Sequence, residues 1–287
     1  LVIRGVGGMP HIKADGNAAE GKGIWVIKGD NTNVENIEFS GAAVEDLNGA
    51  GIRLEGTNLT VSGCYFHDNE NGILTGANPN SEVVIEYSEF SDNGYGDGYS
   101  HNMYIGRIAR FTLRFSYVHN ANVGHQVKSR AVENHILYNR VMDERTGSSS
   151  ILIDLPDPGE ARILGNDLQQ GPYAENPTLI RSAQVLHLVN NTLVNDRGNG
   201  LFVRIVSGSD ASVLQNNIFA GQGTIDAPGA MLRSNLIGTE PGLMNRARYD
   251  YRLRDSSSAV DAGTEPVPTL LPAYEYVHFA SGKERLD

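Results

Sequence analysis

Short segments that end in a large apolar residue recur along the chain. This repetition constrains the fold more than any other feature of the sequence. Eight copies end at Phe39, Phe66, Phe90, Val118, Val141, Leu168, Leu193 and Phe219. The gaps between successive ends are 27, 24, 28, 23, 27, 25 and 26 residues, so the period is close to 26. A second strand-like segment, such as GIRLE or QVKSR, lies between copies. Short strands repeating at this interval predict a solenoid of stacked parallel strands.

One position in each copy, two residues before the apolar end, predicts a ladder of buried polar side chains. Its members are Ile37, Cys64, Ser88, Ser116, Asn139, Asn166, Asn191, Asn217 and Asn235. Residues two apart on a strand share a face, so this column should point inward beside the apolar one. Buried amides need hydrogen-bond partners, which stacked asparagines can supply to one another and to the turn backbone. Cys64, the single cysteine, is expected to be a small buried apolar residue.

The repeat resembles the right-handed parallel β-helix of the pectate-lyase-like superfamily. The resemblance covers about residues 23–238 and implies an all-β, single-stranded solenoid of about 9–10 coils with an asparagine ladder. The segment DYRLRDSSSAVDAG from Asp250 resembles the closing strand of secreted β-helix proteins, so residues 239–287 are expected to close and cap the solenoid. A cap protects the last coil, which is otherwise an unpaired parallel edge. One domain over residues 1–287 is expected, because no linker-like run interrupts the chain.

The composition argues against two classes of partner. The 287 residues carry a formal net charge of −11 and a sequence pI of about 5.2, whereas a nucleic-acid-binding domain is usually basic or carries a recognised reading module. No apolar run approaches the roughly 18–20 residues of a membrane span. One cysteine and the likeness to secreted β-helix proteins indicate an extracytoplasmic protein, whose signal peptide would already be missing from a chain that opens at Leu1.

Positive charge is concentrated in one stretch of this acidic chain. Residues 101–130 hold no Asp or Glu and five fixed cations, which are Arg107, Arg110, Arg114, Lys128 and Arg130. Such a local excess suggests a surface that attracts an anionic ligand. An acidic polysaccharide is the expected partner, by analogy with a fold whose flat sheets can hold a linear polymer. Arg110 and Arg114 also have a plainer interpretation, as the solvent face of the strand ARFTLRF.

Stacking three neighbouring coils predicts a candidate site. When SHNMYIG, GHQVKSR and SSSILID are aligned, the vertical sets are His101 and His125, Asn102 and Gln126, Tyr104 and Lys128, and Gly106, Arg130 and Asp154. Alternation on a strand directs Met103, Val127 and Ile153 inward. The side chains expected to point outward on one sheet are Asn102, Tyr104, Gln126, Lys128, Arg130 and Asp154. Gly106 is expected to leave open space beside Arg130.

This set of side chains suits β-elimination on a uronate chain, which needs a neutralised carboxylate, a base for the C5 proton and a proton for the leaving oxygen. Arg130 matches a carboxylate with its planar fork. Lys128 is the expected base, because a nearby guanidinium and partial burial lower the pKa of an amine. Tyr104, His101 or His125 would protonate the leaving oxygen or serve as an alternative base. The residues expected to bind substrate are Asn102, Gln126, Asp154, Arg107 and Tyr99, the last from the loop DNGYGDGYSH.

The stretch VKSRAVENHILYN resembles the lysine-bearing coil of chondroitinase B and the alginate lyases of its family. Over about 40 residues, the resemblance implies that Lys128 is the catalytic base. That family has an arginine on the next coil, where this chain has ILIDLP with Asp154. It also has acidic calcium ligands before the lysine, where this chain has NVGHQ. No cofactor or metal is therefore expected, because the acidic ligands that calcium would need are missing. Arg130, on the same strand as Lys128, would take the place of the family's arginine.

Three alternatives to a polysaccharide lyase remain open. A glycoside hydrolase of the polygalacturonase kind needs clustered aspartates; GHQVKSR is faintly similar to its His and Arg/Lys elements, but the adjoining coils carry no Asp pair. A C5-epimerase begins with the same proton abstraction and differs in reprotonating the other face. A non-catalytic glycan-binding or structural module would present the same surface without turnover. The sequence names neither the sugar nor the oligomeric state.

Overall fold

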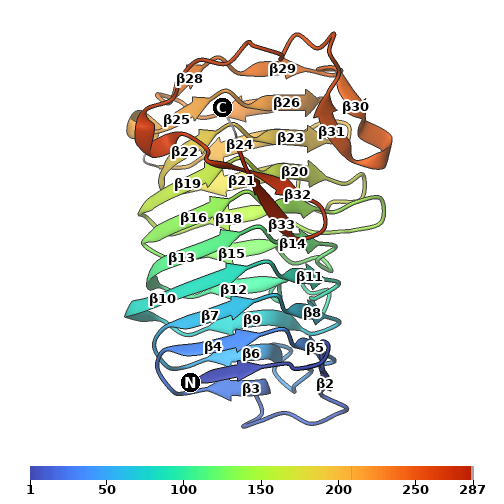
Figure 1. Cartoon of the computed structure of the whole chain (residues 1–287), viewed down its shortest axis with the longest axis vertical. Coiled ribbons are helices and arrows are strands. Elements are labelled where there is room, and N and C mark those ends of the chain that lie inside the picture. Colours follow the sequence, from blue (N-terminus) through green and yellow to red (C-terminus); the bar gives the residue numbers. More distant parts are fainter. Residues whose placement is uncertain (208, 286–287) are drawn as a thin grey trace.

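The computed structural model describes residues 1–207 and 209–285, and it is built from short strands that stack into three parallel sheets (Figure 1). Sheet A consists of β1 (Val2–Arg4), β4 (Thr32–Glu35), β7 (Leu59–Ser62), β10 (Asn78–Glu86), β13 (Ile108–Arg114), β16 (Glu133–Leu137), β19 (Glu160–Leu164), β22 (Val185–Val189), β25 (Val213–Gln215) and β28 (Met231–Arg233). Sheet B consists of β2 (His11–Lys13), β5 (Glu38–Ser40), β8 (Tyr65–His67), β11 (Glu89–Ser91), β14 (Tyr117–His119), β17 (Arg140–Met142), β20 (Asp167–Gln170), β23 (Thr192–Asn195), β26 (Ile218–Gly221) and β29 (Leu236–Gly238).

Sheet C completes each coil. It consists of β3 (Gly23–Ile27), β6 (Ala50–Leu54), β9 (Asn71–Thr75), β12 (Met103–Ile105), β15 (Val127–Ser129), β18 (Ile153–Leu155), β21 (Thr178–Ser182), β24 (Leu201–Ile205) and β27 (Thr224–Asp226). The chain passes from A to B to C in every coil, so each strand pairs with its counterpart one coil away. The expected right-handed parallel β-helix is confirmed. Its sheets begin at β1 and β2, earlier than the repeat expected from residue 23.

The predicted polar ladder is present at the corner between sheets A and B. Nδ2 of Asn166 donates to Oδ1 of Asn191 at 2.9 Å, and Nδ2 of Asn191 donates to Oδ1 of Asn217 at 3.0 Å. Ser88 and Ser116 continue the ladder toward the N-terminus through their hydroxyl groups. The residue before each ladder position has a left-handed φ, and the set is Asn36, Gly63, Tyr87, Phe115, Tyr138, Gly165, Asn190, Asn216 and Ser234. The tight left-handed turn explains why a side chain must supply the hydrogen bonds that the sheets cannot make there.

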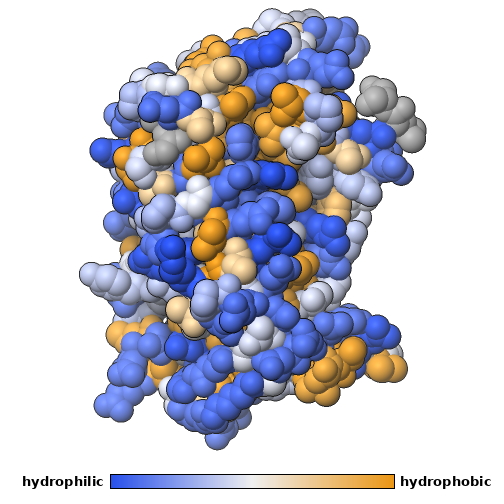
Figure 2. Space-filling view, turned by 90° about the vertical axis from the view of Figure 1, so that its left-hand side faces the viewer, coloured by the Kyte–Doolittle hydropathy of each residue, from blue (hydrophilic) through white to orange (hydrophobic). Residues whose placement is uncertain are grey.

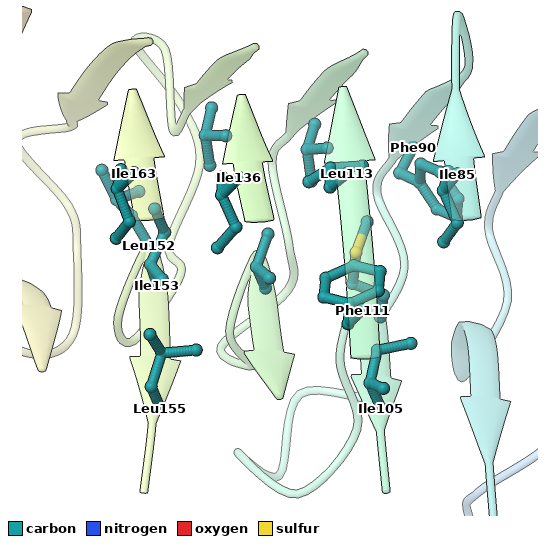
Figure 3. Packing of buried hydrophobic residues seen from close by; sticks show 14 of the residues in the cluster. Ile85, Phe90, Ile105, Phe111, Leu113, Ile136, Leu152, Ile153, Leu155 and Ile163 are labelled. Atoms are coloured by element: carbon teal, nitrogen blue, oxygen red, sulfur yellow. The ribbon is translucent and has the colours of Figure 1, made fainter. Parts of the chain in front are cut away.

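The core lies between the three sheets and is formed by rows of apolar side chains that occupy equivalent positions on successive strands. Ile85, Leu113, Ile136 and Ile163 are Cα partners on successive strands of sheet A, and each is fully buried. Figure 3 shows this row facing the residues of sheet C, among them Ile105, Ile153 and Leu155. The outer faces differ: in the view of Figure 2 the surface is mainly hydrophilic, with hydrophobic side chains in separate small groups. Alternation along each strand therefore places the apolar residues inside and leaves the polar ones available to solvent.

The segment after β29 packs against the side of the solenoid. It contains the antiparallel pair β30 (Leu243–Asn245) and β31 (Asp250–Leu253), and the hairpin of β32 (Tyr274–Val277) and β33 (Ser281–Glu284), which lies over sheet B (Figure 1). Three 3-10 helices complete the chain, η1 (Ser209–Ala211), η2 (Arg246–Arg248) and η3 (Pro268–Leu270). None of the described helices has the length and apolarity that a membrane crossing requires.

Candidate functional site

One outward row of sheet C contains Tyr104 and four charged side chains, one from each of five successive coils. The strand register pairs Tyr104 with Lys128, Lys128 with Asp154, Asp154 with Arg181, and Arg181 with Arg204. Neighbouring strands lie about 4.8 Å apart, so these side chains are immediate neighbours across the sheet. We call Tyr104, Lys128, Asp154 and Arg181 the charged row.

The register corrects the predicted position of Asp154, which stacks on Lys128 and not on Arg130. The β12 and β15 partners Met103 and Val127 are 24 residues apart, whereas Val127 and its β18 partner Ile153 are 26 apart. The coil from Val127 to Ile153 is thus two residues longer than the preceding one, and an ungapped alignment slips by one outward position. Gly106 also differs from expectation: a Cβ at this position would lie 2.5 Å from the carbonyl oxygen of Gly76, so the glycine permits close backbone packing and leaves no open space.

Asp154 is the most buried member of the charged row and is surrounded by donors. Its residue is only 4% exposed. Nη1 of Arg181 donates to its Oδ1 at 3.0 Å, while Nε2 of His125 and Nζ of Lys128 lie 3.6 and 4.0 Å from its Oδ2. The carboxylate therefore binds Arg181 on one side and places a negative charge next to Lys128 on the other.

Lys128 has the electrostatic surroundings of an activated amine. Its side chain is 19% exposed, and its Nζ lies 5.9 Å from the centroid of the Tyr104 ring. Burial lowers the pKa of Lys128, and the positive charges of Arg130 and Arg181 lower it further, against the opposing effect of Asp154. A larger fraction of this amine is neutral at a given pH than for an exposed lysine, which is the property a base requires.

Arg130 lies beside the charged row, held by two partners. Its Nε donates to the hydroxyl oxygen of Tyr104 at 2.9 Å, and its Nη1 donates to Oδ1 of Asp157. Arg107 reaches the other carboxylate oxygen of Asp157 at 3.2 Å. Because the Tyr104 oxygen accepts a hydrogen bond, its own proton stays free to be donated outward.

His101 and His125 form a buried stack next to the charged row. They are 1% and 8% exposed, with ring centroids 4.8 Å apart. The backbone N–H of His125 donates to Nδ1 of His101, and that of Ile151 donates to Nδ1 of His125. Burial lowers the pKa of His125 to about 4 and that of His101 well below its usual range. Both rings are therefore neutral near pH 7 with the proton on Nε2, so they are donors beneath the surface.

The prediction that Asn102 and Gln126 point outward is wrong. Both are fully buried, and Nδ2 of Asn102 donates to Oε1 of Gln126 while Nε2 of Gln126 donates to Oδ1 of Asp143 at 3.0 Å. These residues precede β12 and β15, where the chain turns from sheet B into sheet C, and the alternation of a strand does not extend into that corner. They form a second internal polar ladder, and burial raises the pKa of Asp143 at its end to about 6.

The other predicted cations and Tyr99 do not join the charged row. Arg110 and Arg114 lie on β13 in sheet A, and each pairs with glutamates of neighbouring strands, which confirms their interpretation as a solvent face. The run of five cations is thus divided between two faces, with Arg107 and its partner Asp157 on the side of Arg130. Tyr99 is 86% exposed in the loop before β12.

Two residues of this site were missed in the sequence, Arg181 and Asp157. Arg181 was detectable, because IDL, IRS and VRI continue the strand VKS at intervals of 26, 27 and 23 residues. It supplies an arginine two coils beyond Lys128. Asp157 lies in a loop and carries no periodic signal, so only its contacts with Arg130 and Arg107 identify it.

Comparison with known proteins gives one finding about the fold. Residues 11–141 match a family model described as "Right handed beta helix region". No curated protein and no solved structure shows a significant similarity to the chain. The matched segment ends before Asp154 and Arg181, so half of the charged row lies outside it.

Proposed function

This chain is a right-handed parallel β-helix with a charged row on sheet C, and from that premise we propose that it acts on an acidic, uronate-containing polysaccharide by β-elimination. The observation that carries the proposal is Lys128, a half-buried amine flanked by Arg130 and Arg181. A site with a surplus of fixed cations attracts an anionic polymer although the whole chain is acidic. The protein is expected to work outside the cytoplasm, where such polymers occur.

The guanidinium groups would hold the uronate carboxylate. Arg181 uses one of its donors on Asp154, and Arg130 uses Nε and Nη1 on Tyr104 and Asp157, so both keep N–H groups for a ligand. Neutralising the carboxylate acidifies the adjacent C5–H bond, because the charge that develops on proton loss spreads into the carboxylate. Arg130 was predicted for this role; Arg181 shares it from the other side of Lys128.

Lys128 and Tyr104 would move the protons. The neutral amine of Lys128 takes the C5 proton, the electron pair forms the C4–C5 double bond, and the C4–O bond breaks. The leaving oxygen takes the proton of the Tyr104 hydroxyl, which the ammonium of Lys128 then replaces. His101 and His125 lie beneath this surface as neutral rings, so we assign them the role of positioning Asp154 and Lys128 and not of transferring protons.

The test is to incubate the protein with a panel of uronate polysaccharides and follow the ultraviolet absorbance of the unsaturated product. Lys128→Met should lower the rate by roughly 10²–10⁴-fold, the usual contribution of a general base. Arg181→Gln should raise KM and, by removing a positive neighbour and freeing Asp154, shift the rising limb of the pH–rate profile to higher pH. The matched control is Arg204→Gln, which changes the Cα partner of Arg181 one coil beyond the charged row, where the side chain is 53% exposed; it should leave turnover unchanged.

Other outcomes distinguish the alternatives. New reducing ends without a double bond would establish hydrolysis, and exchange of the C5 proton without cleavage would establish epimerisation. Retention on a polysaccharide column without either product would establish a binding module. Full activity in Lys128→Met would refute the assignment of the base.

A further inference from the structure

A second cluster of side chains lies on sheet B of the first coils, away from the charged row. His11 on β2, Glu38 on β5 and His67 on β8 each offer a ligand atom, and these three atoms lie within 4.8 Å of one another. His11 and Glu38 are Cα partners, and His67 lies one coil further on and two residues along the strand. In the part of the chain that the structure describes, no other three His, Cys, Asp or Glu side chains meet in this way.

The two histidines direct one ring nitrogen each to the same carboxylate oxygen. Nε2 of His67 lies 2.9 Å from Oε1 of Glu38, and Nδ1 of His11 lies 3.5 Å from it. Two ligands of a tetrahedral ion with metal–ligand distances of 2.0–2.1 Å are about 3.3 Å apart. The observed separations bracket that value, so small rotations of the side chains would place all three atoms around one ion.

The opposite ring nitrogens are already occupied by groups that are not ligands. Nδ1 of His67 lies 2.6 Å from Oδ2 of Asp68, and Nε2 of His11 lies 2.7 Å from the hydroxyl oxygen of Ser40, which is 4% exposed. Metal-binding histidines have this arrangement, in which the second nitrogen donates its proton to an outer partner and thereby fixes the tautomer and orientation of the ring. Three candidate ligands and two outer partners, Ser40 and Asp68, are thus brought together from three coils.

We propose that His11, Glu38 and His67 bind a divalent transition-metal ion. Two imidazoles and one carboxylate are a donor set that suits Zn²⁺, and it leaves a fourth position for water or an exogenous ligand. The side chain of His11 is 39% exposed, so an ion can reach the site from solvent. The ion would join three successive coils near the start of the solenoid, and this inference does not depend on the proposed polysaccharide chemistry.

The experiment uses the full chain without an affinity tag, stripped of metal by a chelator and titrated with Co²⁺ and Zn²⁺. We expect one bound ion per chain by calorimetry, visible absorption bands of four- or five-coordinate Co²⁺, and a higher Tm with Zn²⁺. His67→Ala and the isosteric Glu38→Gln should each weaken binding at least about tenfold, because loss of an outer-shell partner alone already costs roughly 10–100-fold. His11→Ala removes a partly exposed side chain, so it tests the site with the smallest effect on folding.

The matched control is His135→Ala, which removes a histidine paired at 2.7 Å with a single glutamate, Glu133. It should bind Co²⁺ as tightly as the wild type. Binding that is absent in the wild type, or equal in His11→Ala, Glu38→Gln and the control, would overturn the proposal. Circular dichroism of the metal-free variants separates loss of the site from loss of the fold.

Discussion

At the scale of single residues, the chemistry of sheet C depends on which ionisable groups are buried. Lys128 keeps contact with solvent, whereas Asp154 and the two histidines lie beneath it. The outward direction of Lys128 followed from alternation, and Tyr104 was correctly stacked beside it. The burial of His125 did not follow from the sequence, because it depends on contacts with His101 of the preceding coil and with Ile151 and Asp154 of the next one.

His125 predicts how stability changes with pH. Its pKa of about 4 in the folded chain lies below the ordinary value of 6.5, so the unfolded chain binds the proton more readily. The contribution of His125 to the free energy of unfolding is therefore fully present above about pH 6.5. It decreases by about 3 kcal/mol as the pH falls toward 4. In His125→Gln, the amide oxygen of the new side chain can still accept from the Ile151 N–H. Urea unfolding should show that the free energy of unfolding decreases less between pH 7 and pH 4 in this variant than in the wild type. Parallel pH dependences in the two proteins would contradict the prediction.

At the scale of elements, the corner between sheets A and B is where polar burial and backbone strain coincide. Tyr87, Phe115 and Tyr138 hold left-handed φ values, and their rings stack at centroid distances of 5.1 and 5.5 Å. Bulky side chains rarely adopt this conformation. The stacking of their rings and the ladder of amides inside the corner compensate for that cost. The ladder column was predicted in full, because its period coincides with that of the apolar column.

Asn166 tests the strength of the ladder. Its Oδ1 accepts from both the backbone N–H and Nδ2 of Asn139, and its Nδ2 donates to Oδ1 of Asn191. Asn166→Ala should lower the free energy of unfolding by about 3 kcal/mol, since buried groups on both neighbours lose a partner. The control is Asn235→Ala in the last coil, where the residue is partly exposed and ends the ladder. Chemical denaturation measures both, and equal losses would refute a cooperative ladder.

At the scale of the whole molecule, the C-terminal segment returns to the middle of the stack. Tyr274 on β32 packs edge-on against Phe115 and Tyr138, and the backbone N–H of Ala273 donates to the Tyr138 hydroxyl oxygen at 2.9 Å. Most contacts in a solenoid join only neighbouring coils. The hairpin β32–β33 therefore adds a long-range connection to the middle of the stack, beside the one that Arg140 makes to the carbonyl oxygen of Tyr249.

Removal of the hairpin should affect the central coils. A chain truncated after Glu265 is expected to show faster amide hydrogen exchange in β14 and β17 and a lower Tm, because the aromatic rings at that corner become exposed to solvent. Hydrogen exchange followed by mass spectrometry locates the change. Sheet C lies on another face, so its β15 amides should keep their protection. Faster exchange confined to β28 and β29 would show that the segment protects only the last coil.

The sequence by itself determined the solenoid, its asparagine ladder and the outward direction of Lys128. These features follow from local alternation repeated at a nearly constant period, and stacking carries the same pattern from coil to coil. The tertiary structure decided which residues meet where the coils differ in length or where the chain turns at a corner. Coils of unequal length set the register, which places Asp154 beside Lys128 and not beside Arg130. Asn102 and Gln126 are buried because the alternation of a strand does not extend into the corner before β12 and β15. The His11, Glu38 and His67 cluster has the same origin, because strands distant in sequence become neighbours only when the coils stack.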